Sequence, residues 1–275
     1  EIKAILAHPE AKCMLDHEAL AEYLTFQNFI SSNTLFKNIA TLNPGHVLTI
    51  QDGQIKSWQY WDFNFSENDQ TLSQAECTEE LERLIVQAVN RQLVSDVEIG
   101  AYLSGGMDSA AITAIAAKQL PFLKTFTCGF DLSSASGLEQ DFDERKDAEH
   151  MSYLFKTEHY EMVLKAGDME RCMDKLAYHI EEPRVGQSYP NFYAAKLASK
   201  FAKVVLAGTA GDEIFAGYPW RYYPQVASHN QAAFLHNYFQ FWQRLFREEE
   251  HPHVFGPIQN QLKDFSAFDR FKQVF

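Results

Sequence analysis

A short loop rich in glycine and serine, lying between an apolar run and a helix-forming run, constrains this chain most. The loop is Ser104-Gly-Gly-Met-Asp-Ser109. The apolar residues 97–103 before it predict a strand, and the alanine-rich residues 110–118 after it predict a helix. A second strand is predicted at 122–130. Two strands separated by one helix form a βαβ unit with a parallel sheet, and ligands bind at the carboxyl ends of such strands.

The alternation of strands and helices extends along most of the chain. A helix is predicted to begin at Ser73, which has Glu76 in capping-box spacing. Short alternating runs at 47–50 and 58–61, around the turn sequences Asn43-Pro44-Gly45 and Gln51-Asp52-Gly53, predict a β-hairpin. We therefore predict an α/β fold, a twisted and mainly parallel sheet with flanking helices, preceded by a β-rich segment. The predicted boundaries are 1–63 for the β-rich segment, 64–74 for a linker and 75–275 for the α/β domain. Later elements are expected as helices at 144–155, 169–178 and 192–201, and strands at 160–164 and 203–207.

The composition of the chain indicates which partners and which cellular compartment to expect. The net charge of −13, from 37 acidic and 24 basic residues, repels polyanions and argues against nucleic-acid binding. Four scattered cysteines show no metal-ligand spacing and are read as reduced thiols. No apolar run approaches the roughly 18 residues of a membrane span. We expect a soluble, cytoplasmic protein with no membrane partner, and a homodimer stays open.

The loop at residues 104–109 has the chemistry of a phosphate cradle. Two adjacent glycines let successive backbone N–H groups turn toward one anion, and the hydroxyls of Ser104 and Ser109 add donors at a helix N-terminus. The loop lacks the Gly-Lys-Ser/Thr ending that serves γ-phosphate transfer, so kinase or GTPase chemistry is not indicated. An ordinary turn before a helix is the alternative for these six residues taken alone.

A second loop, Gly208-Thr-Ala-Gly-Asp-Glu213, directly follows the predicted strand at 203–207. Carboxylates such as those of Asp212 and Glu213 are oxygen ligands that suit Mg²⁺. If both strands belong to one parallel sheet, their ends meet in one crevice, where Asp108 and Asp212 could share a metal. Taken alone, this triplet of Gly, Asp and Glu is usually a turn. The tract 145–161, with His150 and His159, is read as a solvated helix face and strand edge.

The ordered motifs resemble those of the class-II glutamine-dependent asparagine synthetases. The resemblance extends from Glu1 to about Tyr223 and weakens afterwards. Its motifs are Asn43-Pro44-Gly45-His46, Tyr60-Trp61-Asp62, the run from Asp96 to Ser109, Thr125-Phe126-Thr127-Cys128-Gly129-Phe130, Phe142-Asp143-Glu144, Glu182-Pro183, Gly211-Asp212-Glu213 and Gly217-Tyr218.

The resemblance implies an ATP-pyrophosphatase site that uses ATP and Mg²⁺. It implies metal ligands at Asp108 and Asp212, and catalytic positions at Thr209 and Glu213. The backbones of Leu103 and Cys128 would meet the adenine. The implied nucleotide-binding residues are Leu103, Ser104, Gly105, Gly106, Met107, Asp108, Ser109, Cys128, Gly208 and Gly211.

The chain departs from the family pattern in two places. Residues 1–63 resemble the tail of an Ntn-type glutaminase domain, but no cysteine here occupies the nucleophile's place at a mature N-terminus, so we expect no glutamine hydrolysis from these residues. We also expect the natural protein to continue beyond both ends and this segment to contact the remainder of the glutaminase domain. The family usually has an acidic residue where this chain has Thr209.

These observations predict an amide-forming ATP-dependent carbon–nitrogen ligase of the glutamine-hydrolysing asparagine synthase type. A carboxylate substrate would be converted to an acyl-adenylate and then attacked by ammonia, supplied by glutamine in the intact protein. Relatives that form a β-lactam or amidate a sugar uronate stay open, as does a non-catalytic nucleotide-binding or assembly module. An RNA-modifying enzyme that shares the first loop is disfavoured by the acidic charge and by the glutaminase-like segment.

Overall fold

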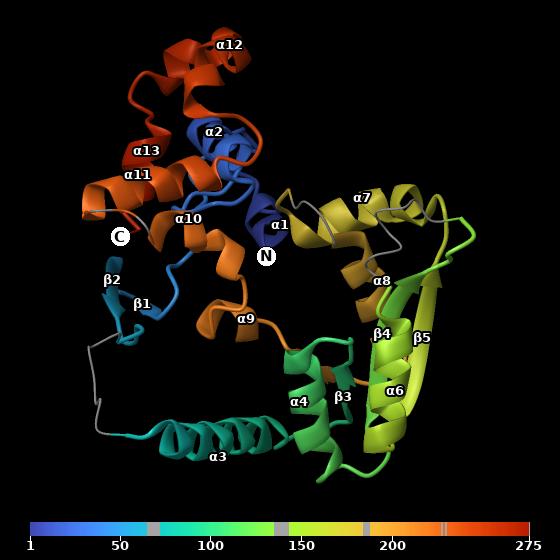
Figure 1. Ribbon diagram of the computed structural model, residues 1–275. Coiled ribbons are helices and arrows are strands. Elements are labelled where there is room, and N and C mark those ends of the chain that lie inside the picture. Colours follow the sequence, from blue (N-terminus) through green and yellow to red (C-terminus); the bar gives the residue numbers. More distant parts are fainter. Residues whose placement is uncertain (65–71, 135–142, 184–187, 227, 229, 275) are drawn as a thin grey trace. The chain divides into compact units, whose positions relative to one another are not determined.

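The computed structural model describes residues 1–64, 72–134, 143–183, 188–226, 228 and 230–274 (Figure 1). The chain divides into two compact units. The first comprises residues 1–67, 180–185 and 219–275, and the second comprises residues 68–179 and 186–218. Most of the linker predicted at 64–74 lies outside the described residues, so the predicted boundaries stay a prediction.

The second unit is built on a four-stranded parallel sheet, which confirms the predicted fold class. Its strand order is β5-β4-β3-β6. The apolar runs predicted from the sequence form its central strands, where β-branched and aromatic residues pack on both faces. The bounds are β3 Ile99–Tyr102, β4 Lys124–Phe130, β5 Glu158–Leu164 and β6 Val204–Leu206.

Helices cover both faces of this sheet. On one face, Ala101 packs with Val89 and Ala116, and on the other Phe126 packs with Leu197 and Ala198. The predicted capping box is present, because Ser73 and Glu76 each accept a hydrogen bond from the other's backbone N–H. The helices are α3 Gln74–Gln92, α4 Met107–Ala117, α6 Arg145–Phe155, α7 Asp168–Ile180, α8 Ser188–Ala198 and α9 Gly211–Ile214.

The first unit combines a hairpin with short helices. The predicted hairpin is confirmed: β1 His46–Gln51 pairs antiparallel with β2 Gln54–Gln59. An aromatic core of Phe26, Phe239 and Phe271 joins helices distant in the sequence. The α-helices are α1 Ile2–Leu6, α2 His17–Phe26, α10 Tyr223–Val226, α11 Gln231–Trp242, α12 His251–Val254 and α13 Ala267–Lys272, with 3₁₀ helices at Pro219–Arg221, Glu248–Glu250 and Gly256–Leu262.

Among the described residues, no helix has both the length and the apolar character that crossing a membrane requires.

Candidate functional site

The start of the first loop is anchored between the two central strands. The Leu103 N–H donates to the Phe126 carbonyl oxygen at 3.0 Å, and the Thr127 hydroxyl donates to the Leu103 carbonyl oxygen. Leu103 is buried, with 1% of its surface exposed. The loop therefore leaves the sheet at a fixed point, and α4 begins four residues later at Met107.

Two serines hold the shape of this loop. The Ser109 hydroxyl oxygen accepts from the Ser104 N–H at 3.1 Å and lies 2.9 Å from the Ser104 hydroxyl oxygen. The Ser104 hydroxyl oxygen in turn accepts from the Gly106 N–H at 3.1 Å. In the described part of the chain, no acceptor contacts the N–H groups of Gly105, Met107 and Asp108. These groups lie at and just before the first turn of α4, where an anion is favoured.

The second loop contacts the first one. Both follow neighbouring strands, because β3 pairs with β6. A Cβ added at Gly208 would lie 2.7 Å from the Ser109 nitrogen, and one added at Gly211 would overlap the Asp108 carboxylate. Asp108 therefore lies directly against the residue that precedes Asp212. The convergence predicted from the sequence is present, and it depends on glycine at both positions.

The carboxylates at the carboxyl edge of the sheet could bind a metal ion only together with other oxygen ligands. Among the described residues, no group of three or more His, Cys, Asp or Glu side chains could hold a metal ion. Mg²⁺ is commonly bound by one or two carboxylates together with phosphate oxygens and water. Asp108 and Asp212 are both half-buried, whereas Thr209 and Glu213 are exposed. The pair is thus suited to Mg²⁺ that arrives with a phosphate ligand.

The Cys128 side chain is not a nucleophile in this setting. Burial is the main reason that the pKa of its thiol is raised to about 12, and the nearby carboxylates of Asp168 and Asp143 raise it further, against the opposing effect of Arg145. A thiol with this pKa stays protonated near neutral pH and is unreactive. Any role at the site belongs to the Cys128 backbone, which is the role that the resemblance implies.

Two side-chain groups near the site were not identified from the sequence. Asp143 and Arg145 form an ion pair of 2.7 Å against the end of β4. His159, read as part of a solvated face, is instead half-buried: its Nδ1 lies 2.9 Å from the Thr125 hydroxyl, and burial lowers its pKa. That interpretation was wrong because β5, although an edge strand, pairs with β4 on one side, and one face of a strand can be covered even where its residues are polar. For the Asp143–Arg145 pair, the sequence signals were the motif Phe142-Asp143-Glu144 and Gly129, which leaves room for a neighbouring side chain.

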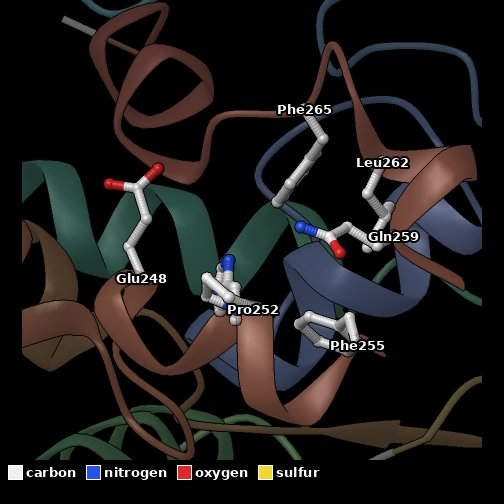
Figure 2. A pocket seen from close by; sticks show the side chains of 7 residues that line it. Glu248, Pro252, Phe255, Gln259, Leu262 and Phe265 are labelled. Atoms are coloured by element: carbon white, nitrogen blue, oxygen red, sulfur yellow. The ribbon is translucent and has the colours of Figure 1, made fainter. Parts of the chain in front are cut away.

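The first unit contains a separate pocket of about 180 Å³ (Figure 2). Glu248, Pro252, Phe255 and Gln259 are among the residues that line it. The wall includes His251, whose Nε2 lies 2.9 Å from the Thr25 hydroxyl oxygen. None of the residues predicted for the site lines this pocket.

A parallel sheet with two converging glycine-rich loops at its carboxyl edge defines an α/β protein of the class in which ligands generally bind at that edge. Residues 80–272 match the family model described as asparagine synthase, and residues 1–61 match the glutamine amidotransferase domain. The chain belongs to the asparagine synthase family.

Individual relatives agree with this assignment. Asparagine synthetase [glutamine-hydrolyzing] 3 of Bacillus subtilis is 32% identical over 246 residues, which cover 83% of this chain and 38% of that protein. A putative asparagine synthetase [glutamine-hydrolyzing] 2 of Methanocaldococcus jannaschii is 30% identical over 225 residues, covering 79% and 42% respectively. The chain thus spans about two fifths of the length of these relatives. The solved NH3-dependent NAD synthetase of Campylobacter jejuni overlays with a TM-score of 0.31 at 15% identity over 74% of this chain and 93% of that one, too loosely to support an argument.

Proposed function

We propose that the second unit binds MgATP and activates a substrate carboxylate as an acyl-adenylate, which ammonia then converts to an amide. The observation that carries this proposal is the contact of the Asp108 carboxylate with Gly211, next to Asp212. This contact brings two carboxylates and the N–H groups of the first loop, which have no acceptor among the described residues, to one edge of the sheet. Membership of the asparagine synthase family supports the same chemistry.

In the proposed first step, a carboxylate oxygen of the substrate attacks the α-phosphorus of ATP. The bond from that phosphorus to the bridging oxygen breaks, and pyrophosphate leaves. The N–H groups of Gly105, Met107 and Asp108 would donate hydrogen bonds that stabilise the negative charge developing on the departing phosphates. Asp108 and Asp212 would hold Mg²⁺, which neutralises phosphate charge when it is bound. The protein's contribution is therefore placement and preorganised donors.

In the proposed second step, the ammonia nitrogen attacks the acyl carbon, AMP leaves and the nitrogen loses a proton. The match of residues 1–61 to the glutamine amidotransferase domain supports glutamine as the ammonia source in the protein. The neutral hydroxyl of Thr209 cannot take up that proton near neutral pH. Glu213, exposed in the same loop, is the carboxylate that we assign to this role.

A pyrophosphate-release screen tests the proposal. The purified protein is supplied with ATP, Mg²⁺, ammonia and a panel of carboxylic acids that includes aspartate and sugar uronates, and both pyrophosphate and amide are measured. We expect release that depends on one class of carboxylate and stops when EDTA removes the metal. Pyrophosphate without amide would support the alternative of a nucleotide-using module without amidation. Absence of both ATP binding and pyrophosphate release would refute the proposed function.

A further inference from the structure

We propose that Arg145 is a positioning residue that fixes the carboxyl end of β4, where the nucleotide base would bind, and so contributes to the choice of adenine. The inference rests on the proposed function, because it names a residue that shapes the same site.

The backbone of β4 has an open edge next to Cys128. The Phe126 carbonyl faces β3, since it accepts from the Leu103 N–H at 3.0 Å. The pairing of β3 with β4 ends at Tyr102 and Phe126, so β4 extends past its neighbour. Backbone groups of a strand alternate between its two sides with a period of two, so the Cys128 N–H and C=O face the side that β3 no longer covers. One donor beside one acceptor complements adenine, whose amino group donates while its ring nitrogens accept.

Arg145 closes this open edge two residues further along. Its Nη2 donates to the Phe130 carbonyl oxygen at 2.8 Å, and Phe130 lies on the same side of the strand as Cys128 by the same alternation. Without Arg145, this carbonyl would have no hydrogen-bond partner among the described residues, at a place that β3 does not reach. Arg145 is the first residue of α6, so the contact ties a helix end to the strand end.

The guanidinium is itself held in place. Its Nε donates to Asp143 Oδ1 at 2.8 Å and its Nη2 donates to Asp143 Oδ2 at 2.7 Å, a bidentate pair. The Asp143 side chain is only 9% exposed and that of Arg145 only 24%. A planar guanidinium in a bidentate pair has a fixed orientation that the single ammonium of lysine cannot reproduce.

Gly129 lets the stem of Arg145 lie on the strand. A Cβ added at Gly129 would lie 2.6 Å from both Cγ and Cδ of Arg145. Gly129 stands between Cys128, the proposed contact of the base, and Phe130. The methylene groups of Arg145 therefore cover the backbone directly after the proposed base contact. A methyl group at this position would displace the stem and the Asp143 carboxylate, whose Oδ1 lies nearer still, without changing any charge.

The test compares Arg145→Ala and Arg145→Lys with the unaltered protein in steady-state pyrophosphate release, varying ATP and then GTP. We expect kcat/KM for ATP to fall between about tenfold and 10²-fold in Arg145→Ala, mainly through KM, since misplacement of a bound group costs this much. The preference for ATP over GTP should shrink, and Arg145→Lys should recover only part of it. Gly129→Ala should reproduce the KM change while Asp143 and Arg145 are both retained.

Arg83→Ala is the matched control. Arg83 also forms a bidentate pair, with Glu80 at 2.7 and 2.6 Å, but this pair is exposed on α3, so its loss should leave KM and nucleotide preference unchanged. If Arg145→Ala does not fold, Arg145→Lys and Gly129→Ala decide the question. Unchanged KM and unchanged preference in the folded variants, with an active unaltered protein, would overturn the inference. An unaltered protein that does not use ATP would instead refute the proposed function.

Discussion

The two loops at the edge of the sheet differ in how firmly their own residues hold them. The first loop has a network around Ser104 and Ser109 and leads into α4, a helix of 11 residues. The second leads into α9, a helix of four residues, and no hydrogen bond of a side chain in 208–213 is found within the described part of the chain. Its Ala210 has φ of +80°. The loop proposed to bind phosphates is thus internally stabilised, whereas the loop proposed to handle the acyl group is not.

The largest expected effect concerns Thr209, in the second loop. If this position faces the activated acyl group, Thr209→Glu adds a base where a neutral hydroxyl now lies, and the amide formed per adenylate should change by about 10²–10⁴-fold with aspartate as the acceptor. ATP–pyrophosphate exchange, which depends on the first loop, should change much less. Thr209→Gln, similar in size to glutamate but unable to act as a base, is the control. Because Thr209 cannot act as a base, we expect that aspartate is not the substrate of the unaltered protein, and efficient asparagine synthesis by that protein would contradict this expectation.

The next effect tests whether the two loops act as one metal site. Asp108→Asn and Asp212→Asn each remove a negatively charged carboxylate that we assign as a ligand of Mg²⁺. We expect each substitution to lower kcat/KM for MgATP by about 10²–10³-fold, which is the usual cost of losing one preorganised electrostatic group. Calorimetric titration with MgATP should show weaker binding in both. Glu79→Gln, on the exposed face of α3, should bind normally. Normal binding by both aspartate variants would remove the metal assignment.

The sequence predicted the first loop better than the second because local pattern determines the first. Apolar residues 97–103, adjacent glycines and an alanine-rich run each favour their own element, so β3, the loop and α4 follow from neighbouring residues. The short helix α9 and the left-handed Ala210 belong to a loop that lies against Asp108, about 100 residues earlier in the sequence, and such a contact is not visible in the local pattern. The Asp143–Arg145 pair and the half-buried His159 likewise depend on which strand lies beside which helix, and periodicity contains no such information.

A smaller effect, on stability, is expected within the first loop. Ser109 is 8% exposed, and its hydroxyl oxygen is the acceptor for the Ser104 N–H. Ser109→Ala leaves this N–H without a partner, and we expect the free energy of unfolding to fall by about 1–3 kcal/mol. Urea denaturation followed by circular dichroism measures the change. Ser199→Ala, which removes an exposed hydroxyl bonded to the Lys196 carbonyl, should cost less. Equal losses in the two variants would show that the Ser109 network stabilises the protein no more than one exposed hydroxyl does.

The smallest effect concerns the backbone of the second loop. A left-handed conformation costs a residue with a Cβ roughly 1–2 kcal/mol, whereas glycine adopts it freely but loses about 0.5–1 kcal/mol more entropy on folding. Ala210, at φ of +80°, is such a residue, so Ala210→Gly should raise the free energy of unfolding by about 0.5–1 kcal/mol and Tm by a few degrees. Ala207→Gly is the control, because Ala207 lies in the preceding segment without a positive φ and gains nothing from glycine. Thermal unfolding of both variants measures the difference. A higher free energy of unfolding in Ala210→Gly together with a lower one in Ala207→Gly would show that the second loop stores backbone strain that the first does not. A lower free energy of unfolding in both variants would show that the two loops differ only in their hydrogen bonds.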